Sequence, residues 1–358
     1  MGQSKSFTLQ MFFIGGILSS TLVGPAPGSA LAQVVGQTSR PPASQVATVD
    51  FGIYQDCPVL TNSTTRVVFC PQVGGRILEY SINGINALFV SQYELTGDAS
   101  GIGGKSPSAG RFDIGPERIA PNRNEFFTGP WTVTAHGARS LQMTSQIGQA
   151  TGVQLTRDFE LDNESSRLVF KQTIKNVSDT TRQYCHWSRT FGNGAGIVLI
   201  PLQGFPRFRN RYVRLDPAGL QMEPKDETIR IRDGFLELLG PPKSPKLGMD
   251  SYAGWLAHQQ SSGLLFIKQF PTYPDRNYCE GAAFTISTWT PASAHTVELE
   301  PIGPSEILAP GQSASFTEIW SLHENPFPGP GETFDLQRLQ SIYDSLPATT
   351  WEAPQPDA

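Results

Sequence analysis

Apolar and polar residues alternate along most of this chain, in short runs that end at glycine, proline or asparagine. The clearest run covers residues 167–176, where Leu168, Phe170, Gln172 and Ile174 would share one face. A period of two predicts a β-strand with one face in the core and the other in water.

Runs of the same kind, rich in β-branched and aromatic residues, recur on both sides of this one and predict further strands. They cover residues 65–70, 76–82, 131–135, 140–145, 153–161, 183–190, 229–231, 254–259, 264–270, 283–289, 296–299 and 315–322. Because no helical pattern of useful length separates most of these runs, a parallel α/β sheet is excluded and one large antiparallel all-β domain is expected. Two long connections rich in glycine and proline, residues 93–127 and 192–216, are expected to cover a site.

Composition agrees with this prediction. The chain has 35 glycines and 29 prolines in 358 residues, which argues against a helical bundle, and its 10% aromatic residues can fill a large core. Its 27 basic and 32 acidic residues include no basic cluster, so nucleic acid is excluded as a partner.

The first residues are typical of a signal peptide. Lys5 precedes an apolar stretch at residues 7–23, and Ala30-Leu31-Ala32 offers a cleavage site, so residues 1–32 are expected to be removed on export. The alternative is a retained membrane anchor, which the polar residues inside the stretch disfavour. We expect a secreted or periplasmic protein with no transmembrane segment after cleavage.

The rest of the chain divides by composition into three parts. Residues 33–48 are rich in Gln, Ser, Pro and Gly and predict a flexible leader. Residues 49–325 form the β-domain, and residues 326–358 a C-terminal extension with a short amphipathic helix at 333–346 and a loose tail.

Export makes the four cysteines candidates for disulfides. Cys57 and Cys70 flank a turn-like segment and would fall opposite each other on a hairpin, so we predict a bridge between them. Cys185 and Cys279 can pair or stay as buried thiols, and the sequence leaves both alternatives open. No zinc-binding spacing occurs and no cofactor is predicted, although Asp and Glu ligands from separate loops would leave no spacing signature.

Three stretches taken in order resemble the galactose mutarotase-like (aldose 1-epimerase-like) superfamily, and in particular its uncharacterised bacterial members. They are Val73-Gly74-Gly75-Arg76-Ile77 with the hairpin at residues 82–89, residues 169–179 followed by His186-Trp187-Ser188-Arg189-Thr190, and Val297-Glu298-Leu299-Glu300-Pro301 running to Pro310-Gly311. The resemblance covers roughly residues 50–325 and implies a large antiparallel β-supersandwich.

The resemblance also implies a catalytic pair. His186 occupies the place of the family's acid histidine and Glu300 that of its base. In mutarotation a carboxylate removes the proton of the anomeric hydroxyl while an imidazole protonates the ring oxygen, which opens the sugar ring. True mutarotases carry a further histidine in the stretch that here contains Arg111 and Asp113, and this chain has none there.

The residues themselves suggest further polar contacts to a sugar. Glu298 and Glu300 stand at i and i+2 and so share a strand face, where the charge of Glu298 would raise the pKa of Glu300. Arg189 would not share the face of His186 without a bulge. For each carboxylate the alternative is an acidic, solvent-facing strand edge, and for His186 it is a core imidazole bonded to a carbonyl group.

The remaining candidates come from other segments. They are Arg76 after two glycines, the loop residues Asp113, Glu117 and Arg118, the aromatic platform Trp187, and Lys268 near a strand end. The alternatives are a surface ion pair for Arg76, an internally paired surface loop for the loop residues, and core packing for Trp187.

The sequence therefore predicts an exported carbohydrate-binding protein, and the resemblance implies that, if it is catalytic, it is an epimerase-like isomerase acting through Glu300 and His186. The alternative, favoured by the missing histidine, is a non-catalytic sugar-binding or cell-surface module with a decayed active site.

Overall fold

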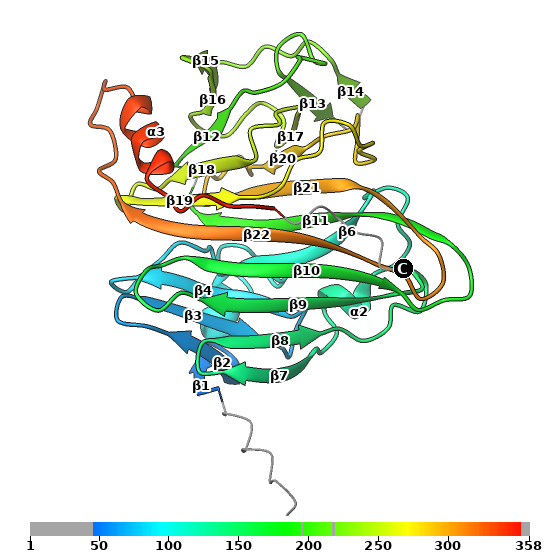
Figure 1. The fold of residues 1–358 in the computed structure, drawn as a ribbon. Coiled ribbons are helices and arrows are strands. Elements are labelled where there is room, and N and C mark those ends of the chain that lie inside the picture. The colour runs from blue at the N-terminus through cyan, green and yellow to red at the C-terminus, as the bar shows by residue number, and fades with distance from the viewer. Residues whose placement is uncertain (1–45, 195, 217–218, 352–358) are drawn as a thin grey trace, which may run out of the picture. The chain divides into compact units, whose positions relative to one another are not determined.

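The computed structural model describes residues 46–194, 196–216 and 219–351 (Figure 1). They belong to one unit of the chain, Pro42–Ala358. The predicted signal peptide and all but the last residues of the predicted leader lie outside the described residues.

Strands dominate the described residues. They are β1 (Thr48–Phe51), β2 (Tyr54–Thr61), β3 (Thr65–Cys70), β4 (Arg76–Ile82), β5 (Ile85–Asn86), β6 (Gly110–Gly115), β7 (Thr132–Gly137), β8 (Ser140–Thr144), β9 (Val153–Leu161), β10 (Leu168–Asn176), β11 (Arg182–Asn193), β12 (Ile197–Pro201), β13 (Tyr212–Asp216), β14 (Gly219–Gln221), β15 (Ile229–Arg232), β16 (Phe235–Leu238), β17 (Lys246–Met249), β18 (Trp255–Gln259), β19 (Leu264–Gln269), β20 (Ile286–Trp289), β21 (Thr296–Leu308) and β22 (Ser313–Glu324). Three short helices are α1 (Gln92–Thr96), α2 (Asn124–Phe127) and α3 (Leu336–Asp344).

The strands form two antiparallel sheets. The 12-stranded sheet runs in the order β1-β2-β3-β4-β6-β11-β21-β20-β17-β13-β14, with β5 paired to β4. The 10-stranded sheet runs β15-β16-β12-β18-β19-β22-β10-β9-β8-β7 (Figure 1). Non-sequential neighbours such as β11 and β21 bring together segments more than 100 residues apart. This is the large antiparallel all-β domain that the alternation predicted, arranged as the sandwich that the resemblance implied.

The core lies between the two sheets. Phe69 of β3 meets Phe159 of β9 with ring centroids 4.7 Å apart, and Tyr80 of β4 meets Trp320 of β22 at 5.6 Å. The predicted face of β10 is confirmed, since Leu168, Phe170, Gln172 and Ile174 are all fully buried. Apolar side chains on alternate positions thus hold the sheets together.

Both long connections contain regular structure that the sequence did not predict. Residues 93–127 include β6 and the helix α2, and residues 192–216 include β12 and β13. The Gly-Arg-Phe-Asp-Ile-Gly sequence of β6 has a strand's alternation, but the surrounding glycines and prolines led to the prediction of a loop. This correction matters because β6 lies beside β11, in the middle of its sheet.

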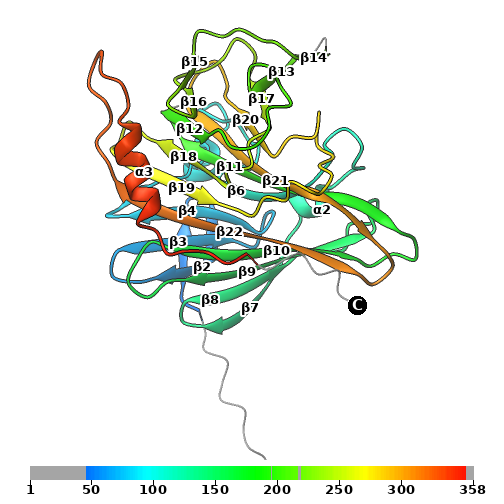
Figure 2. The ribbon, with the colours of Figure 1, turned by 45° about the horizontal axis from the view of Figure 1, so that its top comes forward.

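The C-terminal helix is confirmed in a shorter form. Asp335 caps α3 by accepting a hydrogen bond from the backbone N–H of Arg338. Leu336 and Leu339 are buried in an apolar cluster with Trp255 of β18, whose ring stacks on Tyr343 at 4.0 Å. The helix therefore docks beside β18 and β19 (Figure 2).

No helix among the described residues is long and apolar enough to cross a membrane.

The predicted disulfide between Cys57 and Cys70 is not formed, because all four cysteines are free thiols. The Cys57 thiol donates to the Gln55 carbonyl at 4.0 Å, while the Cys70 sulfur accepts from Arg76 at 3.9 Å. Burial raises the pKa of Cys57 to about 12 and raises that of Cys70 as well. Disulfide formation starts from a thiolate, which burial disfavours here.

Candidate functional site

The two faces of β11 decide which predicted site residues can meet. β11 pairs with β6 on one side and with β21 on the other, and its register to β21 shifts between Cys185 and Trp187. Beyond this irregularity the side chains alternate, so that Trp187, Arg189 and Phe191 point away from the second sheet while Ser188 and Thr190 point into the sandwich.

A cleft of about 590 Å³ lies on the outer face of the 12-stranded sheet, above β6, β11, β21, β20 and β17. Its polar wall contains Arg111, Arg189, Lys246, Glu298 and Glu117. The remaining lining residues are Phe89, Gly103, Ser106, Pro107, Ser108, Phe191, Trp289, His295 and Thr296. Charged groups and aromatic faces therefore surround the same space.

Glu298 is held by two guanidinium groups. Arg189 donates to both of its oxygens, from Nε at 3.1 Å and from Nη2 at 3.2 Å, and Arg111 Nη2 donates to Oε1 at 2.6 Å. Burial opposes ionisation of Glu298, but the charges of Arg189 and Arg111 outweigh it and hold its pKa well below the usual range. Glu298 is a fixed carboxylate with both oxygens occupied.

Glu300 lies on the same strand face but is fully buried and does not line the cleft. Lys246 Nζ donates to its Oε2 at 2.5 Å, and Trp187 Nε1 donates to the same oxygen at 3.2 Å. Its Oε1 has no hydrogen-bond partner among the described residues. Burial is the largest of the effects that raise the pKa of Glu300 to about 7. The charge of Lys246 opposes this shift, and the charge of Glu298 adds to it.

Trp187 forms part of the support beneath the cleft rather than a sugar platform. It is fully buried, with Arg189 over its ring at 4.5 Å and Lys246 at 4.8 Å from the centroid. These cation–π contacts fix the two cleft-lining cations above it.

The predicted loop residues fall into different positions. Asp113 is buried on β6, and its Oδ2 accepts a hydrogen bond from Arg123 Nη2 at 3.2 Å. Burial raises the pKa of Asp113 against the opposing charges of Arg123 and Arg189. Glu117 stands at the rim, with its side chain 44% exposed and 3.8 Å from Arg189. Arg118 is exposed and does not line the cleft.

His186 lies inside the sandwich, so the structure does not bring it to Glu300. It is fully buried, its Nε2 is 3.1 Å from the carbonyl oxygen of Ala314, and its ring lies between Phe112 and Phe316 with centroids 5.9 and 5.7 Å away. Burial lowers its pKa to about 3. The predicted acid–base pair is therefore separated by the sheet, and the alternative of a core imidazole bonded to a carbonyl group is correct.

Lys268 also belongs to the inner face. Its Nζ reaches Thr190 Oγ1 at 2.9 Å, the Leu299 carbonyl at 3.0 Å and Glu318 Oε2 at 3.3 Å, all between the sheets. Burial lowers its pKa to about 8 against the opposing charge of Glu318. It cannot form a wall of the cleft.

Arg76 does not line the cleft either. Its side chain is fully buried, where Nη2 lies 2.6 Å from Glu94 Oε1 and 3.0 Å from the hydroxyl of Tyr54. The preceding Gly75 adopts a φ of 53°, and a Cβ there would lie 2.4 Å from the ring of Trp131. The Gly-Gly-Arg motif thus builds a tight turn and an internal ion pair.

Of the predicted site residues, the cleft is lined by Arg189, Glu298 and Glu117. The prediction missed Arg111, which donates to Glu298, and Lys246, which donates to Glu300. Arg111 and Asp113 stand at i and i+2 in β6, which was a usable signal once that segment is taken as a strand. Lys246 follows Pro245 on a strand of four residues, and no sequence pattern marks it.

No group of three or more His, Cys, Asp or Glu side chains in the described part of the chain is placed to hold a metal ion.

Several solved structures share this fold. A proposed aldose 1-epimerase of Escherichia coli K12 superposes with a TM-score of 0.53 at 12% identity, covering 75% of this chain and 99% of that one. A galactose mutarotase-like protein of Lactobacillus casei ATCC 334 gives 0.52 at 10% identity, covering 75% and 100%. The Slr1438 protein of Synechocystis sp. PCC 6803 gives 0.52 at 16% identity, covering 78% and 98%.

The chain therefore has the galactose mutarotase-like fold, and the fold that the resemblance implied is confirmed. Likeness at these identities establishes the fold alone. No protein-family model matches the chain, and no curated protein matches its sequence.

Proposed function

We propose that this protein is an exported carbohydrate-binding protein that holds a sugar in the cleft above β6, β11 and β21. The observation that carries the proposal is the lining of the cleft, where Arg111, Arg189 and Glu298 form a rigid polar cluster beside the aromatic faces of Phe191 and Trp289. Sugars present hydroxyl groups at their edges and C–H groups on their faces, so they need both kinds of surface.

The cluster is preorganised for binding. Arg111 lies over the ring of Phe191 at 4.7 Å and Arg189 over that of Trp187 at 4.5 Å, so neither guanidinium group has to be ordered by the ligand. A planar guanidinium group offers five N–H donors, and those of Arg111 and Arg189 that face the cleft and are not used on Glu298 would meet hydroxyl oxygens.

Binding is better supported than catalysis. A general base must reach the substrate and have a pKa near the working pH. Glu298 reaches the cleft, but its pKa is well below the usual range and both oxygens are occupied. Glu300 has a pKa of about 7 but does not line the cleft, and His186 lies on the other face of the sheet.

The pKa of Glu300 favours a second candidate, an aldose 1-epimerase-like enzyme. Lys246 both lines the cleft and contacts Glu300 at 2.5 Å, so the Lys246–Glu300 pair would take the proton of the anomeric hydroxyl and return one to the ring oxygen, with no net proton consumed as the sugar ring opens. His186 has no part in this candidate mechanism.

A titration of the purified protein with a panel of aldoses and short oligosaccharides, followed by ligand-observed NMR, tests both candidates. Glu298→Gln should weaken sugar binding by roughly tenfold or more, because the two arginines lose the anion that orients them. The control Arg118→Ala changes a charged residue outside the cleft and should bind normally. Binding of no sugar, or equal binding by Glu298→Gln, contradicts the proposal.

Anomer interconversion measured in the same tubes separates the two candidates. An unchanged rate beside clear binding supports a binding protein. A rate increase that Glu300→Gln abolishes and His186→Leu retains would establish the epimerase-like alternative.

Export rests on the sequence of residues 1–32 and is a separate part of the proposal. The intact mass of the protein recovered from its native cells should correspond to a chain that begins after Ala32. A full-length chain in the cytoplasmic fraction would contradict export.

A further inference from the structure

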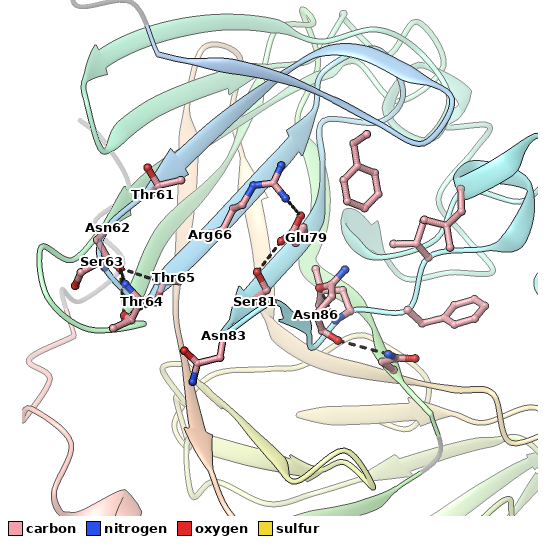
Figure 3. A pocket seen from close by; sticks show the side chains of 17 residues that line it. Thr61, Asn62, Ser63, Thr64, Thr65, Arg66, Glu79, Ser81, Asn83 and Asn86 are labelled. Atoms are coloured by element: carbon pink, nitrogen blue, oxygen red, sulfur yellow. Dashed lines mark hydrogen bonds and ion pairs between the residues drawn. The ribbon is translucent and has the colours of Figure 1, made fainter.

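A second cavity, of about 830 Å³, lies on the same sheet toward its β1 edge (Figure 3). Its wall comes from the β2–β3 turn at Asn62–Thr65, from β4 and β5, and from the end of β11. Most lining side chains are hydroxyl or amide groups: Thr61, Asn62, Ser63, Thr64, Thr65, Ser81, Asn83, Asn86 and Asn193.

The cavity carries no net charge. Its two charged lining residues, Arg66 and Glu79, form an ion pair with each other, and Ser81 donates to the second oxygen of Glu79 at 2.6 Å (Figure 3). The charged cleft differs in this respect, because Arg111, Arg189, Lys246, Glu117 and Glu298 all line it. A neutral ligand rich in hydroxyl groups suits the second cavity better than an ion.

Two exposed amides leave hydrogen-bonding capacity inside it. Asn83 donates from Nδ2 to Glu324 at 2.7 Å, and Asn193 donates from Nδ2 to the carbonyl oxygen of Asn86 at 3.4 Å. Each contact uses an amide N–H, so the amide oxygens can still accept from a ligand hydroxyl. Phe51 and Phe89 add aromatic surface to the lining.

The two cavities adjoin at Phe89, which lines both. Phe89 donates its backbone N–H to the Phe191 carbonyl at 2.8 Å, so its segment runs along the end of β11. On that strand Phe191 lines the cleft and Asn193 lines the second cavity. Residues two apart on a strand are about 7 Å apart, a distance that one short chain of sugars bridges.

We propose that the second cavity is a subsite for a neutral sugar unit, and that the ligand of this protein is an oligosaccharide that spans both cavities. This inference rests on the proposed function and specifies its ligand class. A ligand with units in both sites gains affinity through the effective concentration of the second unit once the first is bound.

The test is a calorimetric titration with malto-, cello-, xylo- and chito-oligosaccharides, from the monosaccharide to the hexasaccharide. For the best series, affinity should rise roughly tenfold or more between the monosaccharide and the trisaccharide. The double variant Asn83→Gly, Asn193→Ala should lose most of this gain and keep the monosaccharide affinity, because it removes two acceptors from the second cavity alone.

The variant is chosen to fold. Asn83 has a φ of 50°, which glycine adopts without strain, and Asn193 is exposed. Asn163→Ala is the matched control, since Asn163 is exposed and lines neither cavity. Thermal unfolding should show the same midpoint for the double variant and for the control to within a few degrees.

Equal affinity for the monosaccharide and longer sugars, or a gain that survives the double substitution, overturns the subsite and leaves the cleft proposal standing. Binding of no sugar in any series overturns both. A gain that disappears only in the double variant establishes the subsite.

Discussion

The two faces of β11 carry charged and titratable groups under opposite conditions. Between the sheets, His186 on the inner face of β11 contacts the Ala314 carbonyl through Nε2, and Lys268 and Glu318 of the facing sheet form an ion pair. On the outer face Arg189 and its partner Glu298 border a cleft. Burial alone therefore does not identify a site, since residues on both faces are nearly or fully buried. What distinguishes the outer cluster is the open space that its side chains line.

The largest expected effect concerns the inner ion pair. Lys268→Ala leaves the carboxylate of Glu318 buried beside Trp320 without its ion-pair partner, which should destabilise the protein by about 3–5 kcal/mol in urea unfolding. The control Lys171→Ala, at an exposed position on β10, should change stability by less than about 0.5 kcal/mol. Sugar affinity of the folded Lys268→Ala protein should stay unchanged; a loss of binding at intact stability would place Lys268 in the site.

His186 should make stability rise with pH. Its pKa is about 3 in the folded protein, below the value of about 6.5 expected for the unfolded chain. Between these values the unfolded chain binds the extra proton, so the free energy of unfolding should increase with pH by up to about 1.4 kcal/mol per unit. His186→Leu should remove this component. Denaturant unfolding at several pH values between 4 and 7 measures it, and identical slopes for both proteins would contradict the buried neutral imidazole.

Glu300 should change the free energy of unfolding with pH in the opposite direction to His186, over a narrower pH range. Its pKa is raised in the folded protein, so the folded state holds the proton more tightly and stability falls as pH rises from about 4.5 to about 7. Glu300→Gln should flatten this fall, and the same unfolding series will show it. If Glu300→Gln leaves the slope unchanged instead, the carboxyl group is ionised in the folded protein over this whole pH range and the contrast between the faces is lost.

The smallest effect is expected at the rim. Arg118→Ala should change stability by less than about 0.5 kcal/mol and leave sugar binding unaltered, because its side chain is exposed and outside the cleft. Titration of this variant beside Arg189→Ala, which removes a cleft-lining cation, makes the comparison direct. An equal loss of sugar affinity in Arg118→Ala and Arg189→Ala would show that the binding site extends beyond the cleft to Arg118.

Some of the site followed from local pattern. The i, i+2 spacing predicted that Glu298 and Glu300 share a strand face. Arg189 stands three residues after His186, and this odd spacing predicted that the two lie on opposite faces of a regular strand. Both statements hold in the structure, where Arg189 meets Glu298 and His186 meets Ala314. The odd spacing between His186 and Arg189 thus already argued against a single site that contains both.

The partners of these residues did not follow from local pattern. Lys246, Arg111 and Glu298 come from strands far apart in the sequence, and their meeting depends on the order β6-β11-β21-β20-β17. The order of strands in a sheet depends on which strands pair with each other and on the connections between them, and no single segment encodes it.

The sequence by itself determined the class of fold, because alternation between buried and exposed positions is a property of each strand and needs no partner to be visible. It also determined which residues share a face within one strand. Only the tertiary structure decided that His186, Lys268 and Arg76 are internal while Arg111 and Lys246 reach the cleft. Both faces of a central strand can carry buried polar groups, and only packing of the second sheet against one of them distinguishes the core from the cleft.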